Sequence, residues 1–442
     1  MDTPIAGDRP DTALPEPAVT TTKAHRVIVA ASIGNALEWF DIMVYAFFAG
    51  TIAKLFFPAA DDTVSLLLVF GTFGVTYVVR PLGAVVLGRY ADRAGRKAAL
   101  MVSIRIMMLG TFLIAVMPTY PTIGVAAPIA ILFSRLLQGF SAGGEFGSAT
   151  ALLSEHTPRM RGFMASWQFA SQGVATLLAA GFGTLLTSTL SDAQLESWGW
   201  RIPFAFGLLI GPIGFYIRRY LDDAPEFARS VRQEPERGPV GEVLRDHKSS
   251  VLLSIGAIAV STALTYLIAY IPNFAVKQLH LPASTGFAAA MVTGAVLTVV
   301  TPLIGYLSDR VGRVRVMSVF AVLILLLLLP AFGYLVAHPG FGVILGVMFL
   351  VGLLKAGYFG PLPALMSELF PVTSRATGVA LSYNLGVMLF GGTTPLVIVW
   401  LIDATGNDLA PTWYLSGLAV LSLTAVLLAR RRLRAVGAAT DE

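Results

Sequence analysis

The chain contains no cysteine, only five histidines and few charged residues: Asp, Glu, Lys and Arg together make up 13% of its 442 positions. Without cysteine it can form no disulfide, no thiolate metal site and no cysteine nucleophile. The histidines are scattered in or near polar breaks, which argues against a metal centre and against an enzyme embedded in a membrane. No nucleotide-binding signature points to ATP as an energy source. We therefore expect no metal, no cofactor and no enzymatic activity.

Apolar residues dominate the chain instead. They make up 55% of it, far more than in a soluble domain of this size. Polar breaks divide the chain into twelve apolar segments, and about 20 residues suffice to cross a hydrocarbon core of ~30 Å. Such segments must be helices, because in lipid every backbone amide has to be paired within its segment. The predicted fold class is an all-α membrane protein with twelve transmembrane helices, near residues 27–53, 64–88, 98–117, 123–150, 162–189, 202–217, 251–276, 286–307, 316–336, 341–368, 376–402 and 412–429.

A repeat divides the chain into two halves. The motif Gly-x-x-x-Asp-Arg-x-Gly-Arg occurs at 88–96 and again at 305–313, and Ser-Glu-x-x-Pro occurs at 154–158 and at 367–371. Duplicated apolar halves are common in solute transporters. We predict two pseudo-symmetric six-helix halves with these boundaries: a disordered cytoplasmic tail at 1–25, halves at 26–217 and 251–430, a cytoplasmic linker loop at 218–250 with a short helix near 240–248, and a cytoplasmic tail at 431–442.

The distribution of basic residues predicts the orientation. Lys and Arg concentrate in alternate loops and in the linker, while the other loops hold little beyond Lys54, Arg201 and Lys277. Cytoplasmic loops are usually the ones rich in Lys and Arg, so both termini are expected in the cytoplasm. The pI of about 9.4 follows from this asymmetry and indicates contact with anionic lipid headgroups, not with nucleic acid.

The repeated hairpin motif also has a structural interpretation. Gly95 or Gly312 suits a tight turn between helices. An Asp at a helix end can accept hydrogen bonds from the free amides that begin a neighbouring helix, which would latch the cytoplasmic side shut. The alternative is positive-inside topology alone, which explains the arginines but not the repeated Asp and Gly. The predicted gating residues are Asp92, Arg93, Gly95, Arg96, Asp309 and Arg310.

Ionisable residues inside the apolar segments are the main functional candidates, because a charge in mid-bilayer is costly and usually faces a partner or a water-filled cavity. Glu38 and Asp41 lie about one turn apart on the first segment, Arg135 lies on the fourth and Lys355 on the tenth. Either carboxylate could instead neutralise Arg135 and hold two helices together. Lys355 could snorkel or pair with a carboxylate.

Three more charges lie deeper on the cytoplasmic side, where Arg80, Arg105 and Glu145 could form a lower polar cluster. The charges inside the apolar segments thus show an excess of one cation. The four cations are Arg80, Arg105, Arg135 and Lys355, and the three anions are Glu38, Asp41 and Glu145. An uncompensated positive charge in a medium of low dielectric constant favours an anionic ligand.

Several motifs carry a family resemblance. The hairpin resembles the loop signature of the major facilitator superfamily, and residues 135–139 resemble its signature in the fourth helix. Three stretches look like the metabolite:proton symporter family, which includes citrate, 2-oxoglutarate, shikimate and proline or betaine transporters: 34–41 with Tyr45, 138–145 and 198–204. Three others are most similar to its citrate and tricarboxylate carriers: 110–114, 382–385 and 390–395.

The resemblance implies that helices 1, 4, 7 and 10 line a central cavity, with Arg135 on one half and Lys355 on the other. Two cations that face each other could grip a multiply charged carboxylate from both halves as the halves rock. The expected substrate-binding residues are Arg135, Lys355, Gln138, Asn35, Tyr45, Tyr358 and Asn384, and the expected proton-coupling residues are Asp41, Glu38 and Glu145.

We therefore predict proton-coupled symport of a small organic acid by alternating access, with citrate or another di- or tricarboxylate as the best candidate. The protein is expected to act as a monomer surrounded by lipid in a bacterial cytoplasmic membrane, with sodium as the alternative coupling ion. Symport of a zwitterionic osmolyte such as proline or betaine, or of shikimate, is the alternative within this class. A non-transporting membrane sensor is the alternative from another class.

Overall fold

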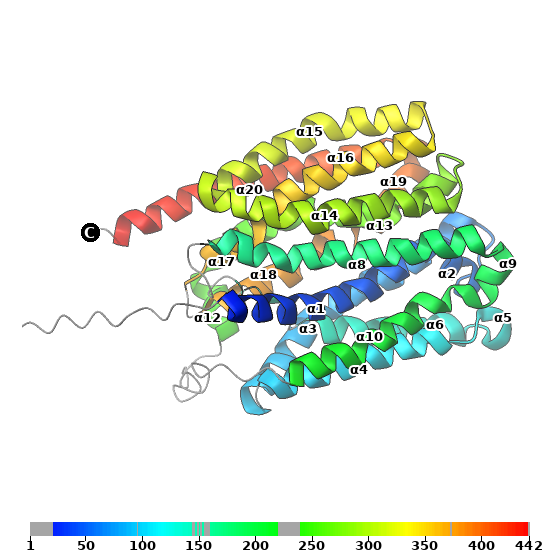
Figure 1. Ribbon diagram of the computed structural model, residues 1–442, viewed down its shortest axis with the longest axis horizontal. Coiled ribbons are helices and arrows are strands. Elements are labelled where there is room, and N and C mark those ends of the chain that lie inside the picture. The colour runs from blue at the N-terminus through cyan, green and yellow to red at the C-terminus, as the bar shows by residue number, and fades with distance from the viewer. Residues whose placement is uncertain are drawn as a thin grey trace, which may run out of the picture.

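The computed structural model describes residues 21–94, 96–143, 146–147, 150, 153, 160–219, 239–371 and 374–440. Every regular element within these ranges is a helix. The long helices lie side by side with their axes along one direction, as Figure 1 shows. In this part of the chain the predicted all-α fold is confirmed.

The helices before the linker are α1 Thr21–Phe47, α2 Ala49–Phe56, α3 Asp62–Ala94, α4 Arg96–Val116, α5 Tyr120–Ile123, α6 Ala126–Ala142, α8 Arg161–Thr189, α9 Asp192–Gln194, the π-helix η2 Leu195–Gly199 and α10 Arg201–Arg219. The helices after it are α12 Pro239–Asp246, α13 Lys248–Lys277, α14 Ala283–Val311, α15 Arg313–Ala337, α16 Phe341–Phe359, α17 Leu362–Glu368, α18 Arg375–Phe390, α19 Thr394–Thr405 and α20 Ala410–Thr440. The predicted short helix near 240–248 is α12.

Eight of the described helical stretches are long and apolar enough to cross a membrane, and α1 with α2, bent by 64° at their junction, makes a ninth. Two shorter apolar helices, Met101–Val116 and Ala126–Ala142, and α10 occupy the remaining predicted segments. Two further predicted spans are broken inside. The chain leaves α16 and begins α17 after Pro361, and it leaves α18 and begins α19 with Pro395 in the first turn, where proline fits best.

The two halves contact each other mainly through α8 and α14, which lie side by side across the middle of Figure 1. Glycines permit this approach: a Cβ on Gly173 would lie 2.6 Å from the amide nitrogen of Thr298 on α14. On another side α3 meets the junction of α18 and α19, where a Cβ on Gly74 would lie 2.9 Å from the carbonyl oxygen of Gly392. Small residues at helix contacts are typical of membrane bundles, since they let backbones approach closely.

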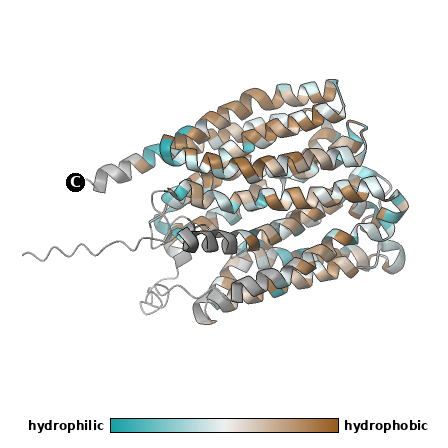
Figure 2. Cartoon of the chain, viewed as in Figure 1, coloured by the Kyte–Doolittle hydropathy of each residue, from teal (hydrophilic) through white to brown (hydrophobic). Residues whose placement is uncertain are grey.

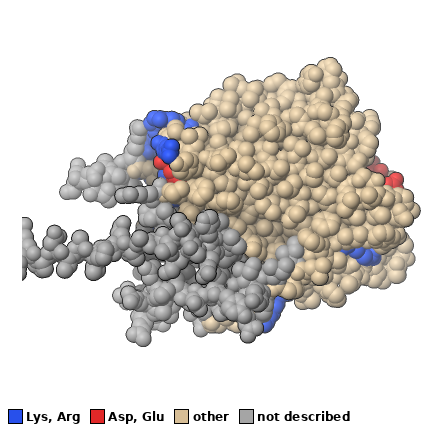
Figure 3. Space-filling view, in the orientation of Figure 1, with Lys and Arg blue, Asp and Glu red and all other residues tan. Residues whose placement is uncertain are grey.

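The outer surface matches a membrane environment. Large apolar side chains such as Leu209 and Leu252 are exposed on the bundle. Hydrophobic residues cover the length of the helices, as Figure 2 shows. On the face drawn in Figure 3 the middle is largely free of charge, and a patch of Lys and Arg lies at the end where α20 leaves the body.

Candidate functional site

The buried charges of the first half form two groups. In the first, the Nη2 of Arg80 on α3 donates to the Oε1 of Glu38 on α1 across 2.7 Å, and both side chains are buried. The guanidinium also lies over the ring of Tyr77, 4.6 Å from its centroid. Arg80 therefore has a partner that the sequence analysis did not propose, and the lower cluster suggested for Arg80, Arg105 and Glu145 stays a prediction. The packing of α3 against α1 brings Arg80 to Glu38, and Glu145 lies outside the described residues.

The second group is a chain of four side chains that runs from a carboxylate to a guanidinium. Thr111 of α4 donates to Asp41 Oδ2, and the Nε2 of Gln138 donates to Thr111 Oγ1 across 3.0 Å. Arg135 Nη1 donates to Gln138 Oε1 across 2.7 Å. Asp41 and Arg135 are therefore joined through two neutral side chains. Asp41 Oδ1 and the Nε and Nη2 of Arg135 have no hydrogen-bond partner within the described part of the chain.

Thr111 completes this connection. It lies in the stretch 110–114 that resembles the citrate carriers, but no role of its own was predicted for it. A lone threonine in an apolar helix usually bonds its own backbone, and the carbonyl oxygen of Met107, 3.1 Å from Thr111 Oγ1, is the alternative acceptor for its single proton. Its position beside Asp41 depends on how α4 packs against α1 and α6, which the sequence does not reveal.

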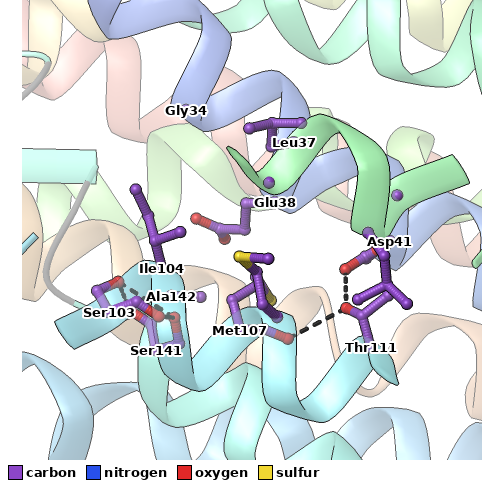
Figure 4. A pocket seen from close by; sticks show the side chains of 14 residues that line it. Gly34, Leu37, Glu38, Asp41, Ser103, Ile104, Met107, Thr111, Ser141 and Ala142 are labelled. Carbon is purple, nitrogen blue, oxygen red and sulfur yellow. Dashed lines mark hydrogen bonds between the residues drawn. The ribbon is translucent and has the colours of Figure 1, made fainter. Parts of the chain in front are cut away.

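A cavity of about 40 Å³ lies inside the first half, between α1, α4, α6 and α10. Both carboxylates, Glu38 and Asp41, line it together with three hydroxyl side chains, as Figure 4 shows: Ser103, Thr111 and Ser141. At roughly 10–15 Å³ for one water, the space admits only a few small molecules of that size. It fits proton exchange better than the binding of an organic solute.

Aromatic rings hold Arg135 from another side. Its Cζ lies 4.3 Å from the centroid of Tyr45 and 5.3 Å from that of Phe73. The hydroxyl of Tyr45 shares a 2.7 Å hydrogen bond with Thr72 Oγ1 on α3. Tyr45 therefore contacts Arg135 through its ring and not through its hydroxyl.

Lys355 lies in the second half, on α16, and only 2% of it is exposed. Its Nζ stands 4.6 Å from the ring centroid of Phe359, and among the described residues it has no ion-pair or hydrogen-bond partner. Phe359 in turn stacks on Phe169 of α8, with the centroids 3.6 Å apart. The neighbouring Tyr358 points elsewhere, because its hydroxyl donates to the carbonyl of Ala257 across 2.7 Å.

The two predicted asparagines both contribute to helix packing. Asn35 donates from Nδ2 to the carbonyl of Gln168 across 2.6 Å and to the Oγ of Ser171 across 2.7 Å, which joins α1 to α8. Asn384 donates to the carbonyl of Gly143 across 2.7 Å, which joins α18 to the end of α6 in the other half. The Oδ1 of Asn384 has no hydrogen-bond partner in the described structure.

The second copy of the hairpin motif makes bonds of the predicted kind. Asp309 accepts hydrogen bonds from the amides of Gly162 at 2.8 Å and Phe163 at 2.9 Å, at the start of α8 in the opposite half. Arg313 donates to Asp309 across 3.1 Å and also pairs with Glu368 across 3.0 Å.

Among the other predicted gating residues, only the side chain of Arg310 is described by the structure. Arg310 contacts Tyr306 on its own helix and not the latch. The side chains of Asp92, Arg93 and Arg96, and residue Gly95, lie outside the described structure. The gating role therefore stays a prediction, supported at Asp309 by geometry.

Comparison with known proteins agrees with this architecture. Residues 27–237 match the model of the family described as Sugar (and other) transporter, and residues 296–440 match that of the Major Facilitator Superfamily. The chain is similar in fold to the xylose transporter of E. coli in a partially occluded inward-open conformation, with a TM-score of 0.73, 14% identity, and 93% and 98% of the two chains covered.

Two curated relatives are similar in sequence over nearly the whole chain. The citrate-proton symporter of Klebsiella pneumoniae is 38% identical over 407 residues, which cover 92% of this chain and 91% of that protein. The proline/betaine transporter of Escherichia coli K12 is 34% identical over 414 residues, which cover 91% of this chain and 82% of that protein. With its helical bundle, its repeated hairpin and these relatives, the chain belongs to the major facilitator superfamily and is a multi-pass membrane transporter.

Proposed function

We propose that this transporter couples the entry of protons to the uptake of a small organic acid, with a di- or tricarboxylate such as citrate as the best candidate. The observation that carries the substrate class is Lys355. Among the described residues no carboxylate pairs with its buried ammonium group, which is costly, and an anionic ligand would supply the missing charge. The relatives named above include a citrate-proton symporter, which agrees with this choice.

The geometry favours Asp41 over Glu38 as the proton carrier. Glu38 is held in a direct ion pair with Arg80, whereas Asp41 reaches Arg135 only through Thr111 and Gln138. Asp41 Oδ1 is also unpartnered within the described residues, so a proton can be added there without breaking a bond. Glu38 and Arg80 then act mainly to hold α1 against α3.

Protonation of Asp41 gives a direct means of coupling. With the carboxylate neutral, Arg135 loses the negative charge that offsets its own, and the first half attracts an anion more strongly. Because linkage is reciprocal, the bound anion also raises the affinity of Asp41 for its proton. Proton and substrate are thus expected to move together, from outside to the cytoplasm, as the halves rock about α8 and α14.

The orientation completes the proposal. Arg310, Arg313, Arg315 and the basic end of α20 lie on the side of the Asp309 latch, which by the positive-inside rule is the cytoplasm. Both termini are then cytoplasmic. The bacterial relatives support placement in the inner membrane.

A zwitterionic osmolyte is the second candidate, because the structure assembles an aromatic cluster that the sequence does not reveal. The ring of Tyr266 on α13 lies 5.4 Å from Phe73, 5.7 Å from Tyr77 and 6.5 Å from Trp39. Such a cluster can bind a quaternary ammonium group. However, Arg135 already lies against Phe73 and Arg80 against Tyr77, so a cationic head group would meet two positive charges there.

Uptake into proteoliposomes under an imposed pH or sodium gradient tests the proposal, with labelled citrate, 2-oxoglutarate, shikimate, proline and betaine as substrates. Lys355→Gln should weaken the binding of a di- or tricarboxylate by about 1.5–3 kcal/mol, the usual range for a hydrogen bond to a charged group, or roughly 10- to 150-fold. A monocarboxylate should lose less. The matched control is Lys54→Gln, which removes an exposed lysine paired with Glu196. Saturable betaine uptake with unchanged carboxylate affinity in Lys355→Gln would favour the osmolyte.

A further inference from the structure

Two buried glutamines on α8 have side chains that make no hydrogen bond of standard geometry within the described part of the chain. Gln168 is 0% exposed and Gln172 is 2% exposed, and neither the Nε2 nor the Oε1 of either amide has a partner within the described residues. They lie one turn apart on the same side of the helix. The lipid-facing side of α8 is a different one, marked by the exposed Leu178 and Leu185.

The turn of α8 that carries these amides is linked to Lys355 by ring contacts. In sequence the two glutamines flank Phe169, whose ring stacks on Phe359 at 3.6 Å, and the Nζ of Lys355 stands 4.6 Å from the Phe359 centroid. Two successive ring contacts thus connect the lysine of one half to the glutamine-bearing turn of the other.

Two further polar groups from the second half belong to the same region. The hydroxyl of Tyr383 approaches the Gln172 side-chain amide as a hydrogen-bonding neighbour, although no bond of standard geometry joins them within the described residues. The next residue, Asn384, uses its Nδ2 to join the halves but leaves its Oδ1 unpartnered among the described residues. The α8 turn and α18 therefore present three buried acceptor oxygens, on Gln168, Gln172 and Asn384.

The chemistry of these oxygens limits the ligand. A buried amide without a partner is costly, so a group on the solute is expected to satisfy it. A carboxylate can bond only the amide Nε2 donors, because it is itself an acceptor. The acceptor oxygens need an O–H or N–H donor. A fully ionised carboxylate without a hydroxyl cannot provide one, and neither can a trimethylated ammonium.

We propose that Gln168 and Gln172 form a subsite that recognises a hydroxyl group on the substrate, so that the preferred substrate is a hydroxy-substituted di- or tricarboxylate. The inference rests on the proposed function, in which Lys355 holds a carboxylate of the same molecule. The hydroxyl donates to a glutamine oxygen and accepts from an Nε2, which satisfies both sides of the amide pair. A site built around a hydroxyl rejects the analogue that lacks it, because its own polar groups then stay unpaired.

Competition against labelled citrate in proteoliposomes tests this with two matched pairs that differ by one hydroxyl: citrate against tricarballylate, and malate against succinate. In the parent protein the hydroxylated member should bind at least about tenfold more tightly. Gln168→Leu and Gln172→Leu should each bring that ratio toward one. Gln278→Leu is the control. Gln278 lies just before the start of α14, whereas Asp309 lies near the end of that helix, and this variant should preserve the ratio.

Thermal unfolding separates recognition from packing. Replacing an unpartnered buried amide by an apolar side chain of similar size should leave the unfolding temperature unchanged or raise it. A fall in that temperature, together with an equal loss of affinity for both members of a pair, would show a structural role and overturn the subsite. The subsite would also be overturned if carboxylate binding depended on Lys355 but showed no preference for the hydroxylated member of a pair. If no carboxylate binds, and Lys355→Gln does not change substrate affinity, the proposed function itself is refuted and not only the subsite.

Discussion

Asp309→Asn tests how the cytoplasmic side is held closed. The carboxylate accepts from the amides of Gly162 and Phe163, at the positive end of the α8 dipole, and these bonds join opposite halves. They can exist only while that side is closed. Asparagine keeps one acceptor oxygen but loses the charge, and the pair of Arg313 with Glu368 remains. A charge-assisted hydrogen bond contributes about 1.5–3 kcal/mol, so the equilibrium should shift toward the open state by roughly 10- to 150-fold.

The absence of native cysteine makes the measurement direct. A single cysteine at Ala165, a fully buried position about one turn beyond the latch on α8, should react slowly with a membrane-impermeant maleimide applied from the cytoplasmic side. Asp309→Asn should raise that rate by about the same factor while changing substrate affinity little. Asp403→Asn is the matched control, because Asp403 is exposed at the end of α19. An unchanged labelling rate, or an equal rise in the control, would refute the latch.

Three further results are expected. Asp41→Asn should abolish proton-driven accumulation but retain substrate exchange, since the amide cannot cycle a proton, and accumulation against a gradient in this variant would place the proton site elsewhere. Glu38→Gln should lower stability by about 3–5 kcal/mol because the buried Arg80 loses its carboxylate partner, Arg80→Gln should also destabilise, and the double variant should recover part of the loss; strictly additive unfolding data would contradict the pairing. Accessibility labelling should place Asp246 in the cytoplasm and Ala60 outside, and the reverse result would overturn the orientation.

The membrane class and the fold could be predicted from composition, because a chain with so much apolar and so little charged sequence has no other way to satisfy its backbone. The duplicated motif indicated two halves because each copy has glycine and aspartate at the same places in a turn between helices. The bonds of Asp309 to α8 agree with that prediction. What the motif could not show is which basic residue supports the aspartate. That residue is Arg313, one turn beyond Asp309, and not the adjacent Arg310.

For the site, the sequence by itself determined which charges are buried, since Glu38, Asp41, Arg135 and Lys355 stand in runs too apolar to lie in water. It did not determine their partners. Helical spacing relates residues on one helix only, whereas partners on other helices depend on how the helices pack against one another.

Only the tertiary structure therefore decided that Glu38 pairs with Arg80 and that Thr111 connects Asp41 to Gln138. It also decided that two buried glutamines, without a hydrogen bond of standard geometry among the described residues, lie on the turn of α8 whose Phe169 stacks on Phe359. Whether a buried polar group is satisfied is a property of the packed bundle, because its partner can come from any helix that the fold brings within about 3 Å.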